Sequence, residues 1–233
     1  MNLSVDLWSA VRDSDLIGII CNIVLAYFSL RSWALIFGKW IWLKRVEGEN
    51  LRFEDDCIAH GGSLEESFKR VKHYRLSPTA AILREAFLEH EVSAPLLQGA
   101  DPGDNGAALE AVRESIRRVI DRTLSDEQDK LEESLGFLAT TANVAPMIGL
   151  FGTVWGILGS FQALAFKGSV AIQTLAPGLS TALSTTVFGL FAAIPAALAF
   201  NYFTGRVRRI LTDMDMFALE MLSVIEKRLV QGR

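Results

Sequence analysis

Residues 140–160 read Thr140-Thr-Ala-Asn-Val-Ala-Pro-Met-Ile-Gly-Leu-Phe-Gly-Thr-Val-Trp-Gly-Ile-Leu-Gly-Ser160, without one Asp, Glu, Lys or Arg. The charge-free stretch around them extends from Ser134 to Phe166, and a second one extends from Gly168 to Gly205. Lys167 is the one charged residue between them. Each stretch exceeds the roughly 20 apolar residues that cross a bilayer as a helix. The sequence therefore predicts a membrane-spanning helical hairpin.

The composition of the whole chain agrees with this prediction. Mean hydropathy is positive (+0.28), yet 21% of the residues are charged, so apolar and charged residues are segregated along the chain. A third apolar stretch covers residues 16–38. Asp6, Asp13 and Asp15 precede it, where a cleaved signal peptide would carry basic residues. We therefore expect a retained first span.

The polar parts of the chain carry helix signals. Ser63-Leu-Glu-Glu66 is typical of a capping box, which predicts a helix to about Tyr74. Ser77-Pro78 predicts the start of a second helix, because proline is favoured at the first helical position. Residues 98–106 are rich in Gly, Asp and Pro and predict a loop. No Gly or Pro interrupts residues 107–135, so we expect a third helix to run straight into the second span.

After the third span, apolar residues recur at intervals of three and four. This spacing predicts a long helix with a heptad-like seam that continues out of the membrane. The seam residues are Ile210, Met214, Phe217, Met221 and Val224.

Basic residues predict the topology, because Lys and Arg accumulate in cytoplasmic segments. They cluster just after the first span and just after the third, whereas the N-terminal lead holds one arginine and the hairpin turn one lysine. The predicted fold class is therefore all-α, a three-span membrane protein whose long helices continue into the cytoplasm. The expected parts are a periplasmic amphipathic lead (1–15), span 1 (16–38), a cytoplasmic helical loop (39–133), span 2 (134–166), a periplasmic turn (167–177), span 3 (178–205) and a cytoplasmic helical tail (206–233).

Small residues recur every four positions along span 2. Such a stripe lets membrane helices approach closely and pack by van der Waals contact. The predicted packing residues of the hairpin are Gly149, Gly152, Gly156, Ser160, Gly189 and Pro195.

Hydroxyl side chains in the same hairpin are candidates for a polar path. Thr153 and Thr186 are equally far from the middle of the hairpin, so in an antiparallel pair they lie at the same depth, near mid-membrane. The alternative is that these hydroxyls only bond to carbonyl groups of their own helix. The candidate lining residues are Thr153, Thr186, Thr181, Thr185 and Ser184.

Neither hairpin span contains an acid or a histidine. Proton pathways in membranes normally use an ionisable group, so a proton-conducting hairpin needs a carboxylate from another polypeptide. The spacing of the three histidines and two cysteines fits no metal site, and no nucleophile constellation, phosphate loop or basic tract suggests an enzyme, a cofactor or nucleic acid. We therefore expect none of these.

Arg31 interrupts the first span. It is costly at mid-bilayer, so we expect its side chain to extend to the interface, where Lys39, Lys44 and Arg45 follow. The alternative is that it pairs with a lipid phosphate or with a neighbouring subunit.

Two stretches of the hairpin resemble the TolQ/ExbB/MotA superfamily. They are Ala145-Pro-Met-Ile-Gly-Leu-Phe-Gly-Thr-Val-Trp-Gly-Ile157 and Leu175-Ala-Pro-Gly-Leu-Ser-Thr-Ala-Leu183, the latter followed by Thr185-Thr-Val-Phe-Gly-Leu-Phe-Ala-Ala-Ile-Pro-Ala196 and Asn201. Length and the short N-terminus favour the TolQ branch, with ExbB second. Many members of both branches carry a glutamate where this chain has Thr181, a departure that leaves room for a gliding-motor branch.

The resemblance implies a pentamer of this subunit in the bacterial inner membrane, around single-span partners of the TolR/ExbD type that each supply an Asp. Thr153 and Thr186 match the polar pair that faces this Asp, and force would pass to a periplasm-spanning protein of the TolA/TonB type. The implied function is a proton-driven stator of the Tol-Pal type, which serves outer-membrane integrity and cell division. The alternatives are an ExbB-like subunit for TonB-dependent uptake, a gliding motor, a membrane scaffold that conducts nothing, and a small transporter.

Overall fold

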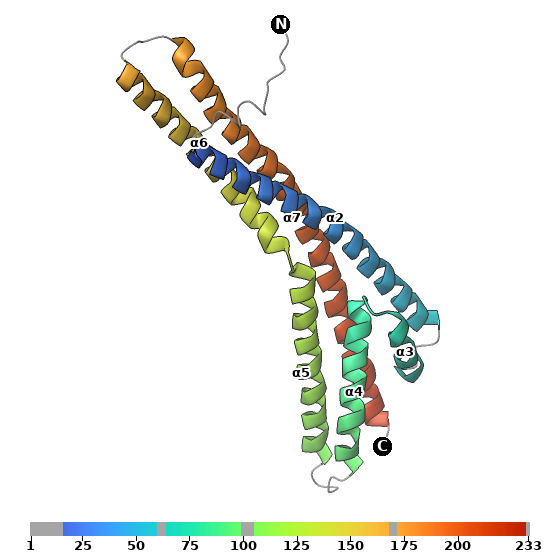
Figure 1. Ribbon diagram of the computed structural model, residues 1–233. Coiled ribbons are helices and arrows are strands. Elements are labelled where there is room, and N and C mark those ends of the chain that lie inside the picture. Colours follow the sequence, from blue (N-terminus) through green and yellow to red (C-terminus); the bar gives the residue numbers. More distant parts are fainter. Residues whose placement is uncertain (1–15, 60–63, 99–104, 168–171, 232–233) are drawn as a thin grey trace. The chain divides into compact units, whose positions relative to one another are not determined.

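The computed structural model describes residues 16–59, 64–98, 105–167 and 172–231, and within them it contains helices and no strand (Figure 1). The all-α prediction is therefore confirmed. The helices are α2 (Leu16–Ala59), α3 (Leu64–Arg70), the short 3₁₀ helix η1 (Val71–His73), α4 (Pro78–Gln98), α5 (Asn105–Glu132), α6 (Leu135–Lys167) and α7 (Ile172–Gln231).

Three of these helices, α2, α6 and α7, are long and apolar enough to cross a membrane. At about 1.5 Å per residue, the 60 residues of α7 extend about 90 Å, three times the thickness of a bilayer's hydrocarbon core. Charged residues return from Lys39 in α2 and from Arg206 in α7, so the apolar parts of both helices end there. Long helices that extend beyond their apolar parts were expected from the sequence.

The chain forms two compact units, and residues 16–39 and 134–203 belong to the first. Within it, α6 and the first half of α7 run side by side in opposite directions (Figure 1). Its buried cluster contains Leu25 and three alanines, Ala145, Ala192 and Ala193. Large apolar side chains such as Phe151 instead cover the outside of the hairpin. Small residues inside and large apolar residues outside are the arrangement that suits a lipid surrounding.

The second unit comprises the described residues of 40–133 and 204–233. Its buried core contains large side chains, in the manner of a water-soluble helical domain. Core members from every long helix of the unit are Phe53, Ile82, Leu83, Ile116, Ile120, Met214 and Ile225. On the predicted seam of α7, Ile210, Met214 and Met221 are buried, and Phe217 and Val224 are half-buried.

Polar contacts fix the helices of the second unit. Ser77 caps α4, because its Oγ accepts a hydrogen bond from the backbone N–H of Ala80 (3.2 Å) and donates one to Oδ1 of Asn50 on α2 (2.5 Å). This confirms the helix start predicted from Ser77-Pro78. Arg206, at the start of the polar part of α7, forms an ion pair with Glu47 of α2.

Two predicted boundaries were wrong. The third polar helix does not run straight into the second span, because α5 ends at Glu132, α6 begins at Leu135, and Ser134 has a left-handed φ of 71°. A left-handed residue ends a helix whether or not it is glycine. The expected turn at 167–177 is also too long, because α7 begins at Ile172 and Pro177 lies inside it. Residues 1–15, 60–63, 99–104, 168–171 and 232–233 lie outside the described residues, so the predicted N-terminal lead, the predicted cap at Ser63 and most of the loop predicted at 98–106 are not described.

Candidate functional site

The two threonines predicted to lie at the same depth contact each other. Oγ1 of Thr153 on α6 is hydrogen-bonded to Oγ1 of Thr186 on α7. The carbonyl oxygen of Gly149 lies within hydrogen-bond distance of both hydroxyls, at 2.9 Å from Thr153 and 3.2 Å from Thr186. Because each hydroxyl has one proton, the pair makes at most two of these three hydrogen bonds at a time. Thr153 is buried and Thr186 is half-buried. Two hydroxyls and one carbonyl from facing helices thus form one polar cluster inside an apolar hairpin.

Glycines bring the two helices together at this cluster. A Cβ atom on Gly189 would lie 2.7 Å from the carbonyl oxygen of Ala145 and 3.1 Å from Cα of Gly149. A Cβ atom on Gly149 would lie 3.1 Å from the carbonyl oxygen of Thr185. The backbones of α6 and α7 are therefore in direct contact at Gly149 and Gly189. The short side chains of Thr153 and Thr186 can reach each other only because the helices approach this closely.

The other small residues of the predicted stripe also lie at the α6–α7 contact. A Cβ atom on Gly152 would lie 2.6 Å from Cγ2 of Thr185, and one on Gly156 would lie 2.7 Å from Cβ of Ala182. Gly178, which was not among the predicted packing residues, also lies at this contact, because its missing Cβ leaves room for Ser160. Pro195 is half-buried in α7, beside the buried Ala193 and Ala196.

The remaining candidate lining residues are not part of the cluster. Oγ of Ser184 donates to the carbonyl oxygen of Ser180 (2.9 Å), and Oγ1 of Thr185 donates to that of Thr181 (3.4 Å). These two hydroxyls follow the alternative interpretation, in which they satisfy carbonyls of their own helix. Of the five candidates, the structure thus brings Thr153 and Thr186 together, and a role in proton transfer stays a prediction for all five.

The cluster can adapt its hydrogen bonds to either protonation state of an approaching carboxyl group. A hydroxyl has one donor and two acceptor lone pairs, and a carbonyl oxygen has two lone pairs. When one threonine donates to Gly149 and the other donates to its neighbour, the hydroxyl oxygens still offer lone pairs to a protonated carboxyl. When either hydroxyl turns away from Gly149, it can donate to a carboxylate instead.

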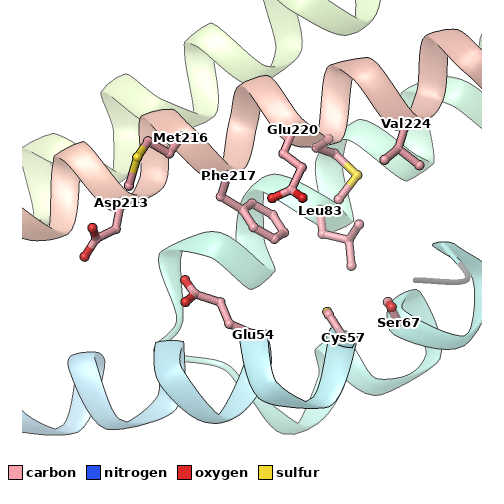
Figure 2. Close-up of a pocket in the computed structure, with 10 residues that line it drawn as sticks. Glu54, Cys57, Ser67, Leu83, Asp213, Met216, Phe217, Glu220 and Val224 are labelled. Carbon is pink, nitrogen blue, oxygen red and sulfur yellow. The ribbon is translucent and has the colours of Figure 1, made fainter. Parts of the chain in front are cut away.

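A cavity lies in the second unit, between the C-terminal parts of α2 and α7 and helices α3 and α4 (Figure 2). It has a volume of about 360 Å³. One part of its lining is acidic (Glu54, Asp213 and Glu220), and the rest is mostly apolar, with Leu83, Met216, Phe217, Met221 and Val224 beside Cys57 and Ser67. This cavity could not be predicted from the sequence, because its lining joins residues of α2, α3 and α4 to residues of α7 that lie more than 120 positions later.

The acidic side of this cavity alters one ionisation. Desolvation raises the pKa of Glu54 above its usual value, and the carboxylates of Asp213, Asp55 and Glu220 raise it further. Burial likewise raises the pKa of the Cys57 thiol. Across residues 16–59, 64–98, 105–167 and 172–231, no three His, Cys, Asp or Glu side chains gather as metal ligands.

Comparisons with known proteins agree with the geometry. The model of the MotA/TolQ/ExbB proton channel family matches residues 77–216, which include both threonines of the cluster. The chain is 32% identical to the Tol-Pal system protein TolQ of Pseudomonas aeruginosa, over 95% of this chain and 93% of that protein. It is 34% identical to the Tol-Pal system protein TolQ of Haemophilus influenzae, over 88% and 87%.

A further relative is the biopolymer transport protein ExbB of Salmonella typhimurium, 29% identical over 89% of this chain and 81% of that protein. The family match covers more than half of the chain, and the relatives align along nearly all of their length. This chain therefore belongs to the MotA/TolQ/ExbB proton channel family.

Proposed function

We propose that this protein is an inner-membrane stator subunit of a Tol-Pal-type motor, which couples proton flow to force on a periplasm-spanning partner of the TolA type. The hydrogen-bonded pair of Thr153 and Thr186 carries the proposal. It is a polar cluster with two interchangeable hydrogen-bond states in a hairpin whose spans have no Asp, Glu, His, Lys or Arg of their own. Full-length similarity to Tol-Pal system proteins favours the Tol-Pal type.

The missing carboxylate defines the partner. Proton transfer in the membrane interior uses an ionisable group, so an Asp on a single-span helix of the TolR/ExbD type docks against the threonine cluster. Its protonated form donates to a threonine oxygen, and its ionised form accepts from a hydroxyl that has turned away from Gly149. Each protonation step changes the favoured hydrogen bonds, and this change moves the partner helix relative to a pentamer of the present subunit.

Valine substitution of the two threonines tests this function. Valine has nearly the shape of threonine but no hydroxyl, so Thr153→Val and Thr186→Val remove the hydrogen bonds and keep the packing. We expect each variant to assemble with the Asp-bearing partner and to lose proton uptake into proteoliposomes. We also expect each to fail to restore detergent resistance and cell separation to a strain that lacks the gene.

Three variants serve as controls. Thr153→Ser and Thr186→Ser keep a hydroxyl and retain most of the activity. Thr140→Val removes an exposed hydroxyl of the same helix, which donates to the Gly136 carbonyl at 2.8 Å, and leaves activity unchanged. Full activity of both valine variants at the pair, or full activity without any Asp-bearing partner, would show that the hydroxyls only pack helices and that the protein is a scaffold.

A further inference from the structure

Arg31 lies in the apolar part of α2, and its side chain is exposed. Its Nη1 donates a hydrogen bond to the hydroxyl oxygen of Tyr27 at 2.7 Å. Its Cζ lies 4.3 Å from the centre of the Phe137 ring on α6, a cation–π distance. The guanidinium is therefore held in one place by two aromatic side chains, although its surface remains open.

The contact with Phe137 indicates the depth of this guanidinium. Phe137 is the third residue of α6 and follows Glu133, the last charged residue before the charge-free stretch, by four positions. From Leu135, where α6 begins, two helical positions to Phe137 correspond to about 3 Å along the axis. Arg31 thus lies near the polar end of the α6 span, at the level where lipid headgroups meet the hydrocarbon core.

No carboxylate in the described part of the chain forms an ion pair with Arg31. The nearest acids in sequence, Asp15 and Glu47, are each 16 positions away. A guanidinium has five N–H donors, of which Tyr27 accepts one. A fixed and open cation on an apolar helix needs an anion, and the guanidinium fork fits two oxygens of one phosphate.

We propose that Arg31, Tyr27 and Phe137 form a binding site for the headgroup phosphate of an anionic phospholipid. Arg31 binds the phosphate oxygens through its remaining N–H donors, and Phe137 keeps the guanidinium plane in position. The Tyr27 hydroxyl accepts from Arg31, so its own proton is free to donate to a second headgroup oxygen. This site does not depend on the proposed motor activity, because none of its residues belongs to the threonine cluster.

The surroundings favour a lipid over free phosphate as the source of this anion. Exposed apolar side chains of the same helix flank Arg31, among them Tyr27, Leu30 and Trp33. The Trp33 ring stacks on Phe37, with centroids 5.6 Å apart, as is usual for aromatic side chains at a membrane interface. Acyl chains can cover these side chains while the headgroup reaches Arg31.

Lipid binding to the delipidated full-length protein in detergent tests the proposal. Native mass spectrometry with added phosphatidylglycerol or phosphatidylcholine measures the bound lipid. We expect phosphatidylglycerol to bind more tightly to the native protein, and Arg31→Gln to weaken that binding about tenfold, which corresponds to the loss of one charge-assisted contact. Arg31→Lys keeps the charge but loses the forked guanidinium. Its affinity for phosphatidylglycerol should therefore lie between that of the native protein and that of Arg31→Gln.

A matched control is Arg209→Gln, which removes an exposed arginine beyond the apolar part of α7 and should leave lipid binding unchanged. Equal binding of phosphatidylglycerol by Arg31→Gln and the native protein would overturn the proposal. An unchanged lipid affinity together with loss of the oligomer would overturn it too, because Arg31 would then pair with an acid of a second copy. Displacement of the lipid by millimolar inorganic phosphate would assign the site to free phosphate.

Discussion

The hydroxyl of Thr153 on α6 is hydrogen-bonded to the hydroxyl of Thr186 on α7, and both can donate to the Gly149 carbonyl. Because each hydroxyl has this second acceptor, the loss of either one leaves no buried donor without a partner. We therefore expect Thr153→Val or Thr186→Val to lower the free energy of unfolding by about 1 kcal/mol or less. Thermal unfolding in detergent, followed by tryptophan fluorescence, measures this. A much larger loss would mean that the pair stabilises the fold and that a loss of activity cannot be assigned to proton transfer.

The glycine contacts predict that alanine substitution changes the stability of the protein in opposite directions at Gly189 and Gly205 of α7. A Cβ atom on Gly189 would meet the carbonyl oxygen of Ala145 at 2.7 Å, and backbone cannot rotate away. We expect Gly189→Ala to separate the helices and to destabilise the protein by about 1–3 kcal/mol, the usual cost of overpacking. Gly205 has no atom within 4 Å of the corresponding position, so Gly205→Ala should stabilise its helix by up to about 1 kcal/mol. Thermal unfolding of both variants checks the difference, and equal effects would contradict it.

The hairpin could be predicted from sequence, because the spans follow from the absence of charged residues and the level of each threonine follows from its distance in sequence from the turn. A long stretch without charge fixes the spans, and the antiparallel direction of α6 and α7 brings Thr153 level with Thr186. The start of α4 was equally predictable, because Ser77 and Pro78 act on the first helical turn alone. Such features depend on the chemistry of adjacent residues and not on distant packing.

Other features depend on contacts between segments far apart in sequence. Glu47 and Arg206 form an ion pair across 159 positions, and no local pattern selects one partner among many charged residues. The acidic cavity requires α2 and α7 to bring Glu54 and Glu220 together. The break before α6 could not be predicted either, because a serine in the left-handed region looks no different in sequence from a helical one.

Ser134 is the position at which this break can be tested. Its φ of 71° lies in the region that costs residues with a Cβ roughly 1–2 kcal/mol and glycine little. We expect Ser134→Gly to raise the free energy of unfolding by about 0.5–1 kcal/mol, since glycine also loses more backbone entropy. The matched control is Ser125→Gly, at a helical position of α5, which should lower it by about 0.5 kcal/mol. Destabilisation by both substitutions would indicate that Ser134 is helical in solution.

The acidic cavity predicts a dependence of stability on pH. Desolvation and three neighbouring carboxylates raise the pKa of Glu54 in the folded protein above the ordinary value of 4.5. A raised pKa means that the contribution of Glu54 to stability is present below pH 4.5 and is lost as the pH rises through the folded-state value. Above that value, the folded protein bears the cost of an ionised group among other negative charges.

Glu54→Gln should therefore raise the thermal unfolding midpoint at pH 7.5 and change it little at pH 4, where the native carboxyl is mostly protonated. Glu91→Gln is the matched control, because Glu91 is exposed and does not line the cavity; we expect no comparable pH-dependent gain from it. The test measures the thermal unfolding midpoints of the native protein, Glu54→Gln and Glu91→Gln at pH 4 and at pH 7.5. If the difference between Glu54→Gln and the native protein is the same at both pH values, Glu54 ionises as it would in the unfolded chain, and the cavity does not disfavour its charge.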